Sequence, residues 1–482
     1  MKVSVKQPLA PGRAWRALVA GLCLLSAGGI VGCGGGADKR PSQTGPDSSP
    51  PASGGIASPP GVDGSTDTNG AGSPVRDAGS GGDAGLGQAQ AVIIAGARQN
   101  VGYLVSLDGS QSKGVNPFGQ VDMYGIKHYV WSFGDGTPER ASDYLTTVTH
   151  TFATAGSYSV RLTVTDHAGA RASTSSVIEV GTLPRQTATG GDIAAAITAL
   201  AGEPGIVTVP AGTFTLGTIN VPAGVIIEGA GAGRTTLVGV TFSTRGDNVR
   251  ITGIEADGAG KSDDNLFSHY RNKNLLVDHS DWHHYEQATS IADYATATLE
   301  DNFIHDHDYD GLGYGIQIAG GSWAMVRRNR FERNRHSIAA GGKSGSTAGE
   351  YVSMPTGYDL IENSISADAV NLDVTIDMHP TGHGRVRIVG NRFDKVKYAI
   401  GLFDGWGEIR GNTFTDVSGY VILSRRPVHN GNFIASAGVY RLDIADNIFT
   451  GCRNHYQIEY GTNITIEGRP VAPPYIADVP PP

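Results

Sequence analysis

Four side chains in the C-terminal half of the chain are of the types that transfer protons, bind carboxylates or orient such groups. They are Arg335, His336, Asp377 and His379. A histidine has an unperturbed pKa near ~6.5, and an arginine binds a carboxylate through two parallel hydrogen bonds. Elimination from a uronic acid needs a base near C5 of the sugar, a positive group beside the carboxylate and an acid for the leaving oxygen. These residue types suit that chemistry if the fold brings them together.

The elements that would position them come from a repeat in the same half of the chain. An Asp or Asn followed two residues later by an apolar residue recurs between Asp301 and Phe449, and each copy precedes a short β-like segment. One isoleucine anchors each segment: Ile316, Ile338, Ile376, Ile400, Ile422 and Ile458. Successive anchors are 22, 38, 24, 22 and 36 residues apart. A basal coil of about 22 residues with two long insertions is typical of a stacked β-solenoid.

Alignment of these coils predicts one candidate site on three neighbouring coils. Residues alternate inward and outward along a strand, and equivalent positions on successive coils lie about 4.8 Å apart. With the isoleucines inward, the polar residues at outward or adjoining positions are Tyr314, Gln317, Arg335, His336, Asp377 and His379. Their neighbours in these rows are mostly Ala or Gly, which leaves space for a substrate. We expect Tyr314 and Gln317 to contact that substrate.

Each of the remaining residues has an expected role in the reaction. His336 would act as base or acid and His379 as the complementary proton-transfer group, while Arg335 neutralises the substrate carboxylate. Asp377 would orient a histidine or bind a metal. A structural alternative is that His336 and Asp377 form a hydrogen-bonded pair between coils that only orders the stack. Titratable clusters on a groove favour the functional interpretation.

An acidic segment suggests a cation site next to this groove. Asp306, Asp308 and Asp310 precede Gly311 in a D-x-D-x-D-G pattern, the first half of a calcium-binding loop. The glutamate usual at the twelfth position is Gln317, so the pattern is incomplete. The sequence therefore leaves two interpretations open, Ca²⁺ bound by the three aspartates or a solvated acidic turn.

Of three further polar groups, two are interpreted mainly as structural and one is left open. We expect most of the clustered arginines to offset nearby acids, with Arg335 as the functional exception; the others are Arg327, Arg328, Arg330 and Arg333. The segment 278–284, Asp-His-Ser-Asp-Trp-His-His, offers metal or sugar contacts, but the sequence leaves its register open. A row of asparagines is predicted to form hydrogen bonds at a coil corner: Asn329, Asn363, Asn391, Asn412 and Asn447.

Composition limits the class of protein and divides the chain. The 482 residues include 69 Gly and 24 Pro, and the net charge is −9, which argues against a nucleic-acid partner. Residues 34–90 are a Gly/Ser/Pro-rich linker with almost no large apolar side chain, so we expect them to be disordered. The chain has only Cys23, Cys33 and Cys452, which excludes a disulfide framework.

The N-terminus is typical of an export signal. Basic residues precede an apolar stretch, Ala17–Val31, that is too short for a comfortable membrane span. The residues Ile30-Val31-Gly32-Cys33 resemble the lipobox of bacterial lipoproteins. That resemblance implies a signal peptide over 1–33, lipidation of Cys33, membrane attachment through the acyl chains and a place on the outer membrane or cell surface.

Residues 91–181 have the strand and turn pattern of a small β-sandwich. The segments Tyr129–Thr137 (YVWSFGDGT), His150–Phe152 (HTF) and Leu162–Asp166 (LTVTD) resemble those of a PKD domain. This resemblance implies that Trp131 and Phe133 lie in the core. It also implies a spacer or weak glycan-binding module on a surface enzyme, with no catalytic residue of its own.

Residues 185–482 begin with a short predicted helix, Asp192–Leu200, followed by strands bounded by Gly or Pro. The order of helix, strand, PAGTF (210–214) and VIIEGAGAGRTTL (225–237) resembles the start of right-handed parallel β-helices of the pectate-lyase-like superfamily. The expected fold class is therefore all-β, a PKD-type sandwich followed by a right-handed parallel β-helix. This fold hosts lyases, hydrolases, esterases and epimerases, so it does not decide the reaction.

The residues and resemblances together predict a monomeric surface enzyme that cleaves an extracellular acidic polysaccharide by β-elimination. An inverting glycoside hydrolase is an alternative, but it needs two carboxylates roughly 6.5–9.5 Å apart and only Asp377 stands clearly in the predicted groove. A non-catalytic glycan-binding protein or adhesin is the alternative from another class.

Overall fold

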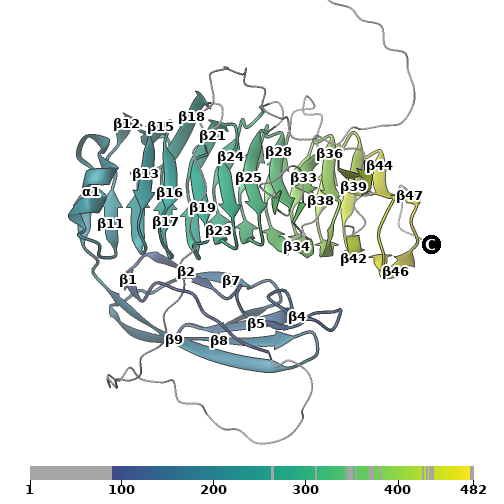
Figure 1. Ribbon diagram of the computed structural model, residues 1–482, viewed down its shortest axis with the longest axis horizontal. Coiled ribbons are helices and arrows are strands. Elements are labelled where there is room, and N and C mark those ends of the chain that lie inside the picture. Colours follow the sequence, from purple (N-terminus) through teal and green to yellow (C-terminus); the bar gives the residue numbers. More distant parts are fainter. Residues whose placement is uncertain are drawn as a thin grey trace, which may run out of the picture.

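The computed structural model describes residues 89–261, 265–309, 312–341, 343–344, 351–352, 355–367, 374–379, 383–425, 428–429, 432–433 and 439–477. The predicted signal peptide, the lipidation of Cys33 and the linker up to residue 88 lie outside these residues. Two all-β units follow, a small sandwich and a long solenoid, as the sequence predicts (Figure 1).

The sandwich has a larger sheet and a smaller one. The larger sheet has the order β1-β9-β8-β5-β6 and the smaller one pairs β2 with β7. The strands are β1 (Arg98–Asn100), β2 (Leu104–Asp108), β5 (Ile126–Ser132), β6 (Arg140–Ser142), β7 (Thr147–Thr151), β8 (Gly156–Asp166) and β9 (Arg171–Gly181), with a short hairpin of β3 (Gly114–Val115) and β4 (Val121–Asp122). Trp131 and Phe133 are buried in its core, which confirms their predicted positions.

The solenoid begins with a short helix that covers its first coil. After the turn η1 (Thr189–Gly191), α1 runs from Ile193 to Ala199, and Asp192 caps it by accepting a hydrogen bond from the Ala195 N–H at 2.9 Å. Ile193 and Ala196 are buried against the core of the first coils. The predicted helix at Asp192–Leu200 is confirmed, and it covers strand edges that would otherwise be exposed.

Within the described residues, the solenoid strands form three parallel sheets, named here by an early strand of each. The β11 sheet contains β10 (Arg185–Thr187), β11 (Gly205–Thr208), β14 (Val225–Glu228), β17 (Arg250–Thr252), β20 (Leu275–Asp278), β23 (Thr296–Glu300), β26 (Trp323–Arg327), β31 (Thr356–Ile361), β34 (His383–Val389), β37 (Gly405–Arg410), β42 (Val439–Ala445), β45 (Ile464–Ile466) and the antiparallel β46 (Arg469–Val471).

The β12 sheet contains β12 (Gly212–Thr215), β15 (Thr235–Val238), β18 (Glu255–Lys261), β21 (Asp281–Tyr285), β24 (Phe303–His305), β27 (Arg330–Glu332), β32 (Ser364–Ser366), β35 (Arg392–Asp394), β38 (Thr413–Thr415) and β43 (Ile448–Thr450). The β13 sheet contains β13 (Thr218–Val221), β16 (Thr241–Thr244), β19 (Phe267–Tyr270), β22 (Thr289–Ala292), β25 (Tyr314–Ala319), β28 (His336–Gly341), β33 (Val374–Met378), β36 (Tyr398–Leu402), β39 (Tyr420–Ser424), β44 (Asn454–Ile458) and the antiparallel β47 (Tyr475–Ala477).

Two antiparallel pairs lie in the insertions. They are β29 (Lys343–Ser344) with β30 (Tyr351–Val352), and β40 (Val428–His429) with β41 (Asn432–Phe433). The first follows β28 and the second follows β39, which agrees with the two long gaps between anchor isoleucines.

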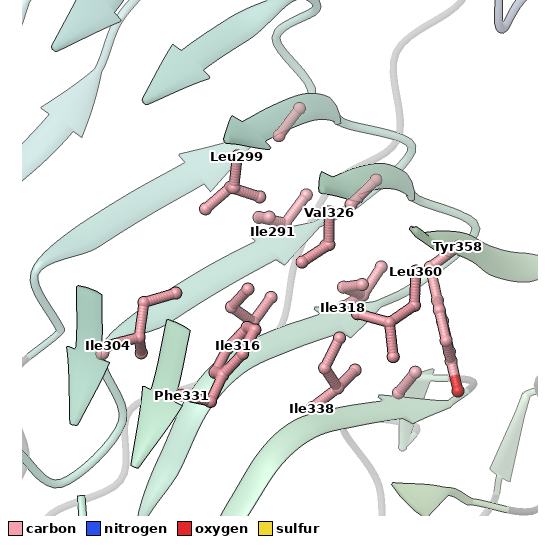
Figure 2. Close-up of a cluster of buried hydrophobic side chains, with 14 of the residues drawn as sticks. Ile291, Leu299, Ile304, Ile316, Ile318, Val326, Phe331, Ile338, Tyr358 and Leu360 are labelled. Carbon is pink, nitrogen blue, oxygen red and sulfur yellow. The ribbon is translucent and has the colours of Figure 1, made fainter. Parts of the chain in front are cut away.

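One apolar core runs along the inside of the coils. Figure 2 shows part of it, where Ile316, Ile318 and Ile338 of the β13 sheet point toward Leu299 and Val326 of the β11 sheet. The predicted anchors stack in one register from Ile316 through Ile422. The last anchor is wrong, because Ile422 pairs with Tyr456 and Ile458 lies two residues further along the strand. A tyrosine therefore fills the inward position that an isoleucine was expected to fill.

The asparagine row forms a ladder between coils, as predicted. The side chain of each buried member accepts hydrogen bonds from the backbone and side chain of the asparagine one coil earlier and donates to a backbone carbonyl. Asn391, for example, accepts from Asn363 at 2.8 and 3.0 Å and donates to the Leu360 carbonyl at 2.9 Å. The ladder also includes Asn302, which donates to Asn329. These bonds satisfy backbone groups at a coil corner, so the ladder is structural.

The sandwich is docked along the outer face of the β11 sheet (Figure 1). Polar contacts between the two units begin near the first coil, where the Tyr103 hydroxyl donates to Glu228 at 2.9 Å, and extend to Tyr144, which donates to Glu408 at 3.3 Å. Trp323 and Met325 of β26 point outward and pack with Trp406 and with Tyr124 of the sandwich. This sheet face is therefore covered, and the outer faces of the β12 and β13 sheets carry the remaining polar clusters.

Candidate functional site

Three adjacent strands of the β13 sheet position the predicted site residues. β25, β28 and β33 pair in parallel, with Ile338 opposite both Ile316 and Ile376. Because these isoleucines are buried in the core, the alternating positions point outward, and Asp377 lies on the outer row next to Ala339. The predicted register of these coils is confirmed. The four residues Arg335, His336, Asp377 and His379 lie together and are called the Asp377 cluster below.

Asp377 is the centre of this cluster. Its Oδ2 lies 2.8 Å from His379 Nε2 in an ion pair and 3.9 Å from His336 Nδ1. Its other carboxylate oxygen is buried and has no hydrogen-bond partner among the described residues. Burial would raise the pKa of the Asp377 carboxyl, but the positive groups around it, His379 first among them, hold the pKa below its ordinary value. Asp377 is therefore an anion whose second oxygen is buried and unmatched within the described residues.

The two imidazoles differ in access and in charge. The charge of Asp377 raises the pKa of His379, whose side chain is 36% exposed. Burial lowers the pKa of His336, whose side chain is 6% exposed and whose Nδ1 lies 2.5 Å from the Val374 carbonyl oxygen. Because a carbonyl only accepts, that contact places the proton of neutral His336 on Nδ1. One histidine therefore favours the cationic form and the other the neutral form, which suits an acid and a base.

Arg335 and Tyr314 complete the arrangement on the neighbouring coils. Arg335 is largely buried, and one of its Nη atoms donates to the Leu312 carbonyl at 2.9 Å. The Tyr314 ring lies one coil earlier with its centroid 5.3 Å from that of His336. Gly341 makes room for His379, since a Cβ at this glycine would lie 2.9 Å from the His379 Cβ.

Gln317 lies apart from the Asp377 cluster. It occupies the same outward row two coils before Asp377, a separation of about 10 Å. Its side-chain oxygen accepts hydrogen bonds from Gln287 and, at 3.4 Å, from Ser290. Gln317 therefore belongs to a polar stretch of the β13 sheet that precedes the cluster, and contact with a substrate stays a prediction for it and for Tyr314.

The three aspartates predicted to bind Ca²⁺ are not equivalent. Asp306 accepts hydrogen bonds from two nitrogens of Arg333 at 2.6 and 2.7 Å and contacts His305 Nδ1 at 2.5 Å. Arg333 and then His305 lower the pKa of Asp306. Asp308 is exposed, and Asp310 lies outside the described residues. Both oxygens of Asp306 already have cationic partners, and calcium binding stays a prediction.

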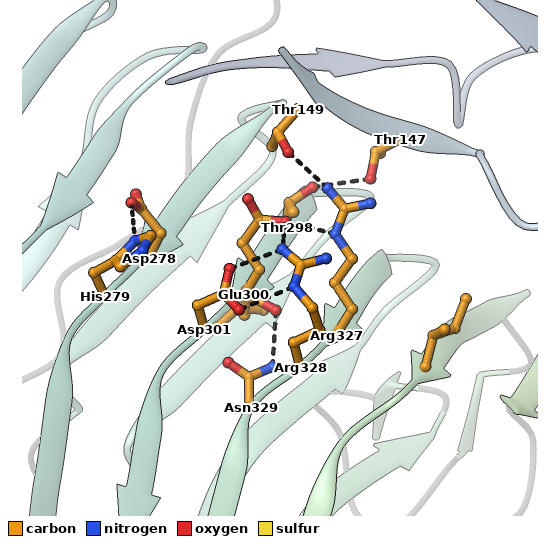
Figure 3. A network of polar contacts seen from close by, with 12 residues as sticks. Thr147, Thr149, Asp278, His279, Thr298, Glu300, Asp301, Arg327, Arg328 and Asn329 are labelled. Carbon is orange, nitrogen blue, oxygen red and sulfur yellow. Dashed lines mark hydrogen bonds and ion pairs between the residues drawn. The ribbon is translucent and has the colours of Figure 1, made fainter. Parts of the chain in front are cut away.

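The other arginines of the segment 327–335 form ion pairs with acidic side chains, as predicted. Arg327 donates to Glu300 at 2.5 Å and to Thr149 of the sandwich at 2.9 Å (Figure 3). Arg328 forms two hydrogen bonds with Asp301, at 2.9 and 2.7 Å. Arg330 pairs with Glu332, and Arg333 pairs with Asp306 as described above. Arg327, Arg328 and Arg333 thus join neighbouring coils, and Arg327 also binds the sandwich, whereas Arg330 pairs within its own strand.

A second histidine cluster lies on the β12 sheet, in the segment whose register the sequence left open. β21 pairs with β18 so that His283 lies beside Asp257, and with β24 so that His283 also lies beside His305. The ligand-type atoms of Asp257, His283 and His284 lie within 4.8 Å of one another. The same is true of Asp281, His283 and His305. Sequence reasoning missed Asp257 and His305 because the anchor isoleucines that set the register belong to the β13 sheet and start at Ile316, after these strands of the β12 sheet.

The sequence also gave no sign of a cavity of about 260 Å³ between the sandwich and the β11 sheet. Trp406, His167 and Arg385 are among the residues that line it. Burial, followed by the nearby positive charges, lowers the pKa of His167 to about 4. The buried Nε of Arg385 has no hydrogen-bond partner among the described residues.

Comparison with known families identifies the sandwich. Residues 91–180 match the family described as PKD domain, so the sandwich is a PKD domain, as the sequence predicts. A search of curated proteins finds no match to the chain. Within the described residues, no helix has the length and apolar character that a membrane crossing requires.

Several solved structures resemble parts of the chain. One, of carbohydrate-binding modules from the β-sandwich superfamily, is 30% identical and covers 20% of this chain and 36% of that chain, with a TM-score of 0.17. A family 28 exopolygalacturonase of Yersinia enterocolitica is 11% identical over 80% of this chain and 100% of that chain, with a TM-score of 0.37. The catalytic domain of a GH87 α-1,3-glucanase is 12% identical over 80% of this chain and 86% of that chain, with a TM-score of 0.33. Likeness at this level does not extend to substrate or reaction.

Proposed function

We propose that the protein is a carbohydrate-active enzyme that cleaves a uronic-acid-containing polysaccharide at the Asp377 cluster by β-elimination. The observation that carries this proposal is the carboxylate of Asp377 between two imidazoles of opposite protonation preference, His379 and His336, beside the Arg335 guanidinium. The groups acting on the Asp377 carboxylate are cationic or imidazole groups. Because inversion by hydrolysis needs a second carboxylate, this set favours elimination.

The reaction would use these groups in the following way. Nε2 of neutral His336, which carries no proton, takes the proton from C5 of the sugar. The C4–O4 bond breaks as a C4–C5 double bond forms. His379, kept cationic by Asp377, gives its proton to the departing O4, so that proton and electron pair are both accounted for. Arg335 stabilises the charge that develops on the uronate carboxylate. The chain's own residues thus supply each of the three groups that elimination requires.

The position of the cluster suits an extended polymer. It lies on the outer row of the β13 sheet, while the PKD domain covers the β11 sheet. Equivalent positions on successive coils repeat at about 4.8 Å, so neighbouring coils can contact successive parts of one sugar chain. The polar row through Gln317 and Ser290 would extend the contact toward the N-terminal coils.

Incubation with a panel of uronic-acid polymers tests the proposal, with absorbance of the unsaturated product as the readout. Asp377→Asn keeps the shape of the side chain but removes its charge, and we expect it to lower the rate by about 10²-fold or more. Asp394→Asn, at an exposed carboxylate on the same solenoid, is the matched control and should keep full activity. New reducing ends without the chromophore would contradict elimination, and binding without any product would favour a glycan-binding protein or adhesin. Repeating the assay with a chelator and then with added Ca²⁺ tests the calcium prediction.

We also propose that the protein is a lipoprotein anchored at the cell surface through Cys33. The basis is the lipobox-like sequence ending at Cys33 and the Gly-rich segment that follows it. Expression in a bacterial host with a labelled fatty acid should give a labelled membrane protein, and Cys33→Ala should remove the label. A labelled Cys33→Ala protein would contradict this assignment.

A further inference from the structure

We infer that Asp257, His283 and His284 form a binding site for a divalent transition-metal ion of the Zn²⁺ class, called the His283 site. It lies on β18 and β21 of the β12 sheet, whereas the Asp377 cluster lies on the β13 sheet. The inference therefore does not depend on the proposed polysaccharide cleavage. It concerns ligands that differ from the three aspartates discussed above.

The ligand atoms of the three side chains converge on one point. Nδ1 of His283 lies 3.5 Å and Nδ1 of His284 lies 3.4 Å from the same oxygen, Oδ1 of Asp257. In a tetrahedral site with metal–ligand bonds of about 2.0–2.1 Å, two ligand atoms lie about 3.3 Å apart, close to these values. The two Nδ1 atoms are 2.7 Å apart, a hydrogen bond that an ion would replace with a wider spacing, and their rings are almost perpendicular, at 87°. In-plane lone pairs of perpendicular rings can meet at one ion.

The backbone brings two consecutive histidines to the same side of the sheet. Successive residues of a strand normally point to opposite faces. His284 has a φ of +58°, a left-handed conformation near the end of β21, and its ring lies beside Asp257 on the same side as that of His283. Gly258, directly after Asp257, permits the close approach, since a Cβ there would lie 2.2 Å from the His284 carbonyl oxygen. The fold thus holds the ligands at a position where a regular strand could not.

A carboxylate behind His283 supports the assignment independently of the three ligands. Oε1 of Glu255 lies 3.5 Å from Nε2 of His283, on the ring nitrogen that faces away from Asp257. Histidines that bind metals usually donate their second N–H to a carboxylate, which fixes the tautomer and the ring orientation. Glu255 is placed to do this for His283, leaving its Nδ1 lone pair toward the ion.

The neighbouring group of Asp281, His283 and His305 is less suited to a metal. Both ring nitrogens of His305 already contact carboxylates, Asp281 at 2.9 Å and Asp306 at 2.5 Å. The rings of His305 and His283 are stacked, 4.8 Å apart at 26°. Lone pairs of stacked rings run nearly parallel and do not converge on one ion. His305 therefore bridges two acids, and the ion belongs with His284.

The donor set defines the class of ion. Two imidazoles and one carboxylate suit Zn²⁺ and related first-row ions, whereas Ca²⁺ and Mg²⁺ prefer oxygen ligands. Three protein ligands also leave a fourth position open to water or another ligand. The side chains of Asp257 and His284 are 31% and 52% exposed, so an ion can reach the site from solvent.

Metal titration of the chelator-treated full-length protein tests the inference. We expect one equivalent of Zn²⁺ to bind, with Co²⁺ at the same site giving a visible absorption band that Zn²⁺ removes and Ca²⁺ does not. His284→Ala alters a half-exposed side chain and should weaken binding by at least about 10²-fold, and Glu255→Gln by roughly 10- to 100-fold. His279→Ala, at an exposed histidine on the same coil that contacts Asp278, is the control and should leave binding unchanged.

Three results would overturn the assignment. They are the absence of stoichiometric Zn²⁺ binding, unchanged binding in folded His284→Ala, and displacement of Co²⁺ by Ca²⁺. If His305→Ala abolished binding while His284→Ala preserved it, the ion would belong to the neighbouring group and the assignment would likewise be wrong. Circular dichroism of each variant confirms that it is folded.

Discussion

Two regions of the molecule bury charged groups: the interface between the PKD domain and the solenoid, and the Asp377 cluster. They differ in how completely those charges are paired. At the interface, Arg387 donates to Asp359 Oδ1 at 2.7 Å and to Thr146 at 2.8 Å, and both charged side chains are at most 4% exposed. In the Asp377 cluster, one carboxylate oxygen has no partner among the described residues and His379 reaches solvent. Charges matched by fixed partners hold two units together, whereas the partly matched charge of Asp377 lies beside a histidine that reaches solvent.

The same contrast appears within the interface itself. Arg385 donates to the Ile126 carbonyl at 3.0 Å, but its buried Nε has no partner in the described part of the chain. This arginine lines the cavity of about 260 Å³ between the two units. Arg387 lines the same cavity, so the two arginines differ in how their nitrogens are matched and not in their contact with the hollow.

The largest effect is expected at the matched pair of the interface. Arg387→Ala would leave the Asp359 carboxylate buried without its main partner, which should lower the free energy of unfolding by about 3–5 kcal/mol. Denaturant unfolding of the full-length protein measures this. Arg410→Ala is the matched control because Arg410 pairs with the exposed Asp446, and such pairs contribute about 0–1 kcal/mol. Equal losses in the two variants would break the comparison.

The pH dependence of stability should distinguish a buried neutral histidine, His269, from one paired with a carboxylate, His379. His269 is fully buried between Thr244 and the Thr296 carbonyl, and burial lowers its pKa to about 4. The unfolded chain, with a pKa near ~6.5, binds this proton more readily, so the contribution is complete above pH ~6.5 and is lost as pH falls toward 4. The loss should reach about 3 kcal/mol, and His269→Leu should remove this part of the acid dependence.

His379 should contribute with the opposite sign. Its folded pKa is raised by Asp377, so its stabilisation is complete below pH ~6.5 and is lost as pH rises through the folded pKa. The free energy of unfolding of His379→Gln should therefore depend less on pH on the alkaline side and keep its dependence on the acid side. A change confined to the acid side in this variant would contradict the assigned protonation state.

The smallest effect is expected in the asparagine ladder. Asn391→Ala leaves the buried Asn363 amide and the Leu360 carbonyl without partners, which should cost about 1–3 kcal/mol in urea unfolding. Asn447→Ala, at the less buried end of the ladder, should cost less. Because the ladder is structural, folded Asn391→Ala should keep the proposed polysaccharide cleavage. Loss of cleavage would mean that the ladder also supports the Asp377 cluster.

Much of the fold and the register of the site could be predicted from the sequence because an inward isoleucine occupies the same position in several successive coils. That signal placed Asp377 beside Ala339 and near His336. It failed at Tyr456, where another large side chain fills the same inward position. It also does not cover the first coils, where the inward positions of the same sheet hold Ile219, Phe242 and Phe267.

The docking of the PKD domain could not be predicted from charge patterns. An outward arginine such as Arg387 is indistinguishable in sequence from a solvated one. The usable signal was apolar: Trp323 and Met325 alternate with the inward Ala324 and Val326, so both faces of that strand are apolar. The His283 site was hidden for a different reason, since its strands lie in the β12 sheet before the first anchor isoleucine, and the left-handed backbone at His284 departs from strand alternation.

The lengthwise docking of the PKD domain has a mechanical consequence. The contacts extend from Glu228 of an early coil to Glu408 of a late one, parallel to the solenoid axis. A force applied at the N-terminal side of the domain and directed along that axis would load these contacts in shear, many at once, instead of opening them one after another. The two units would therefore carry tension as a single body, and rupture would require a higher force than peeling the same contacts apart.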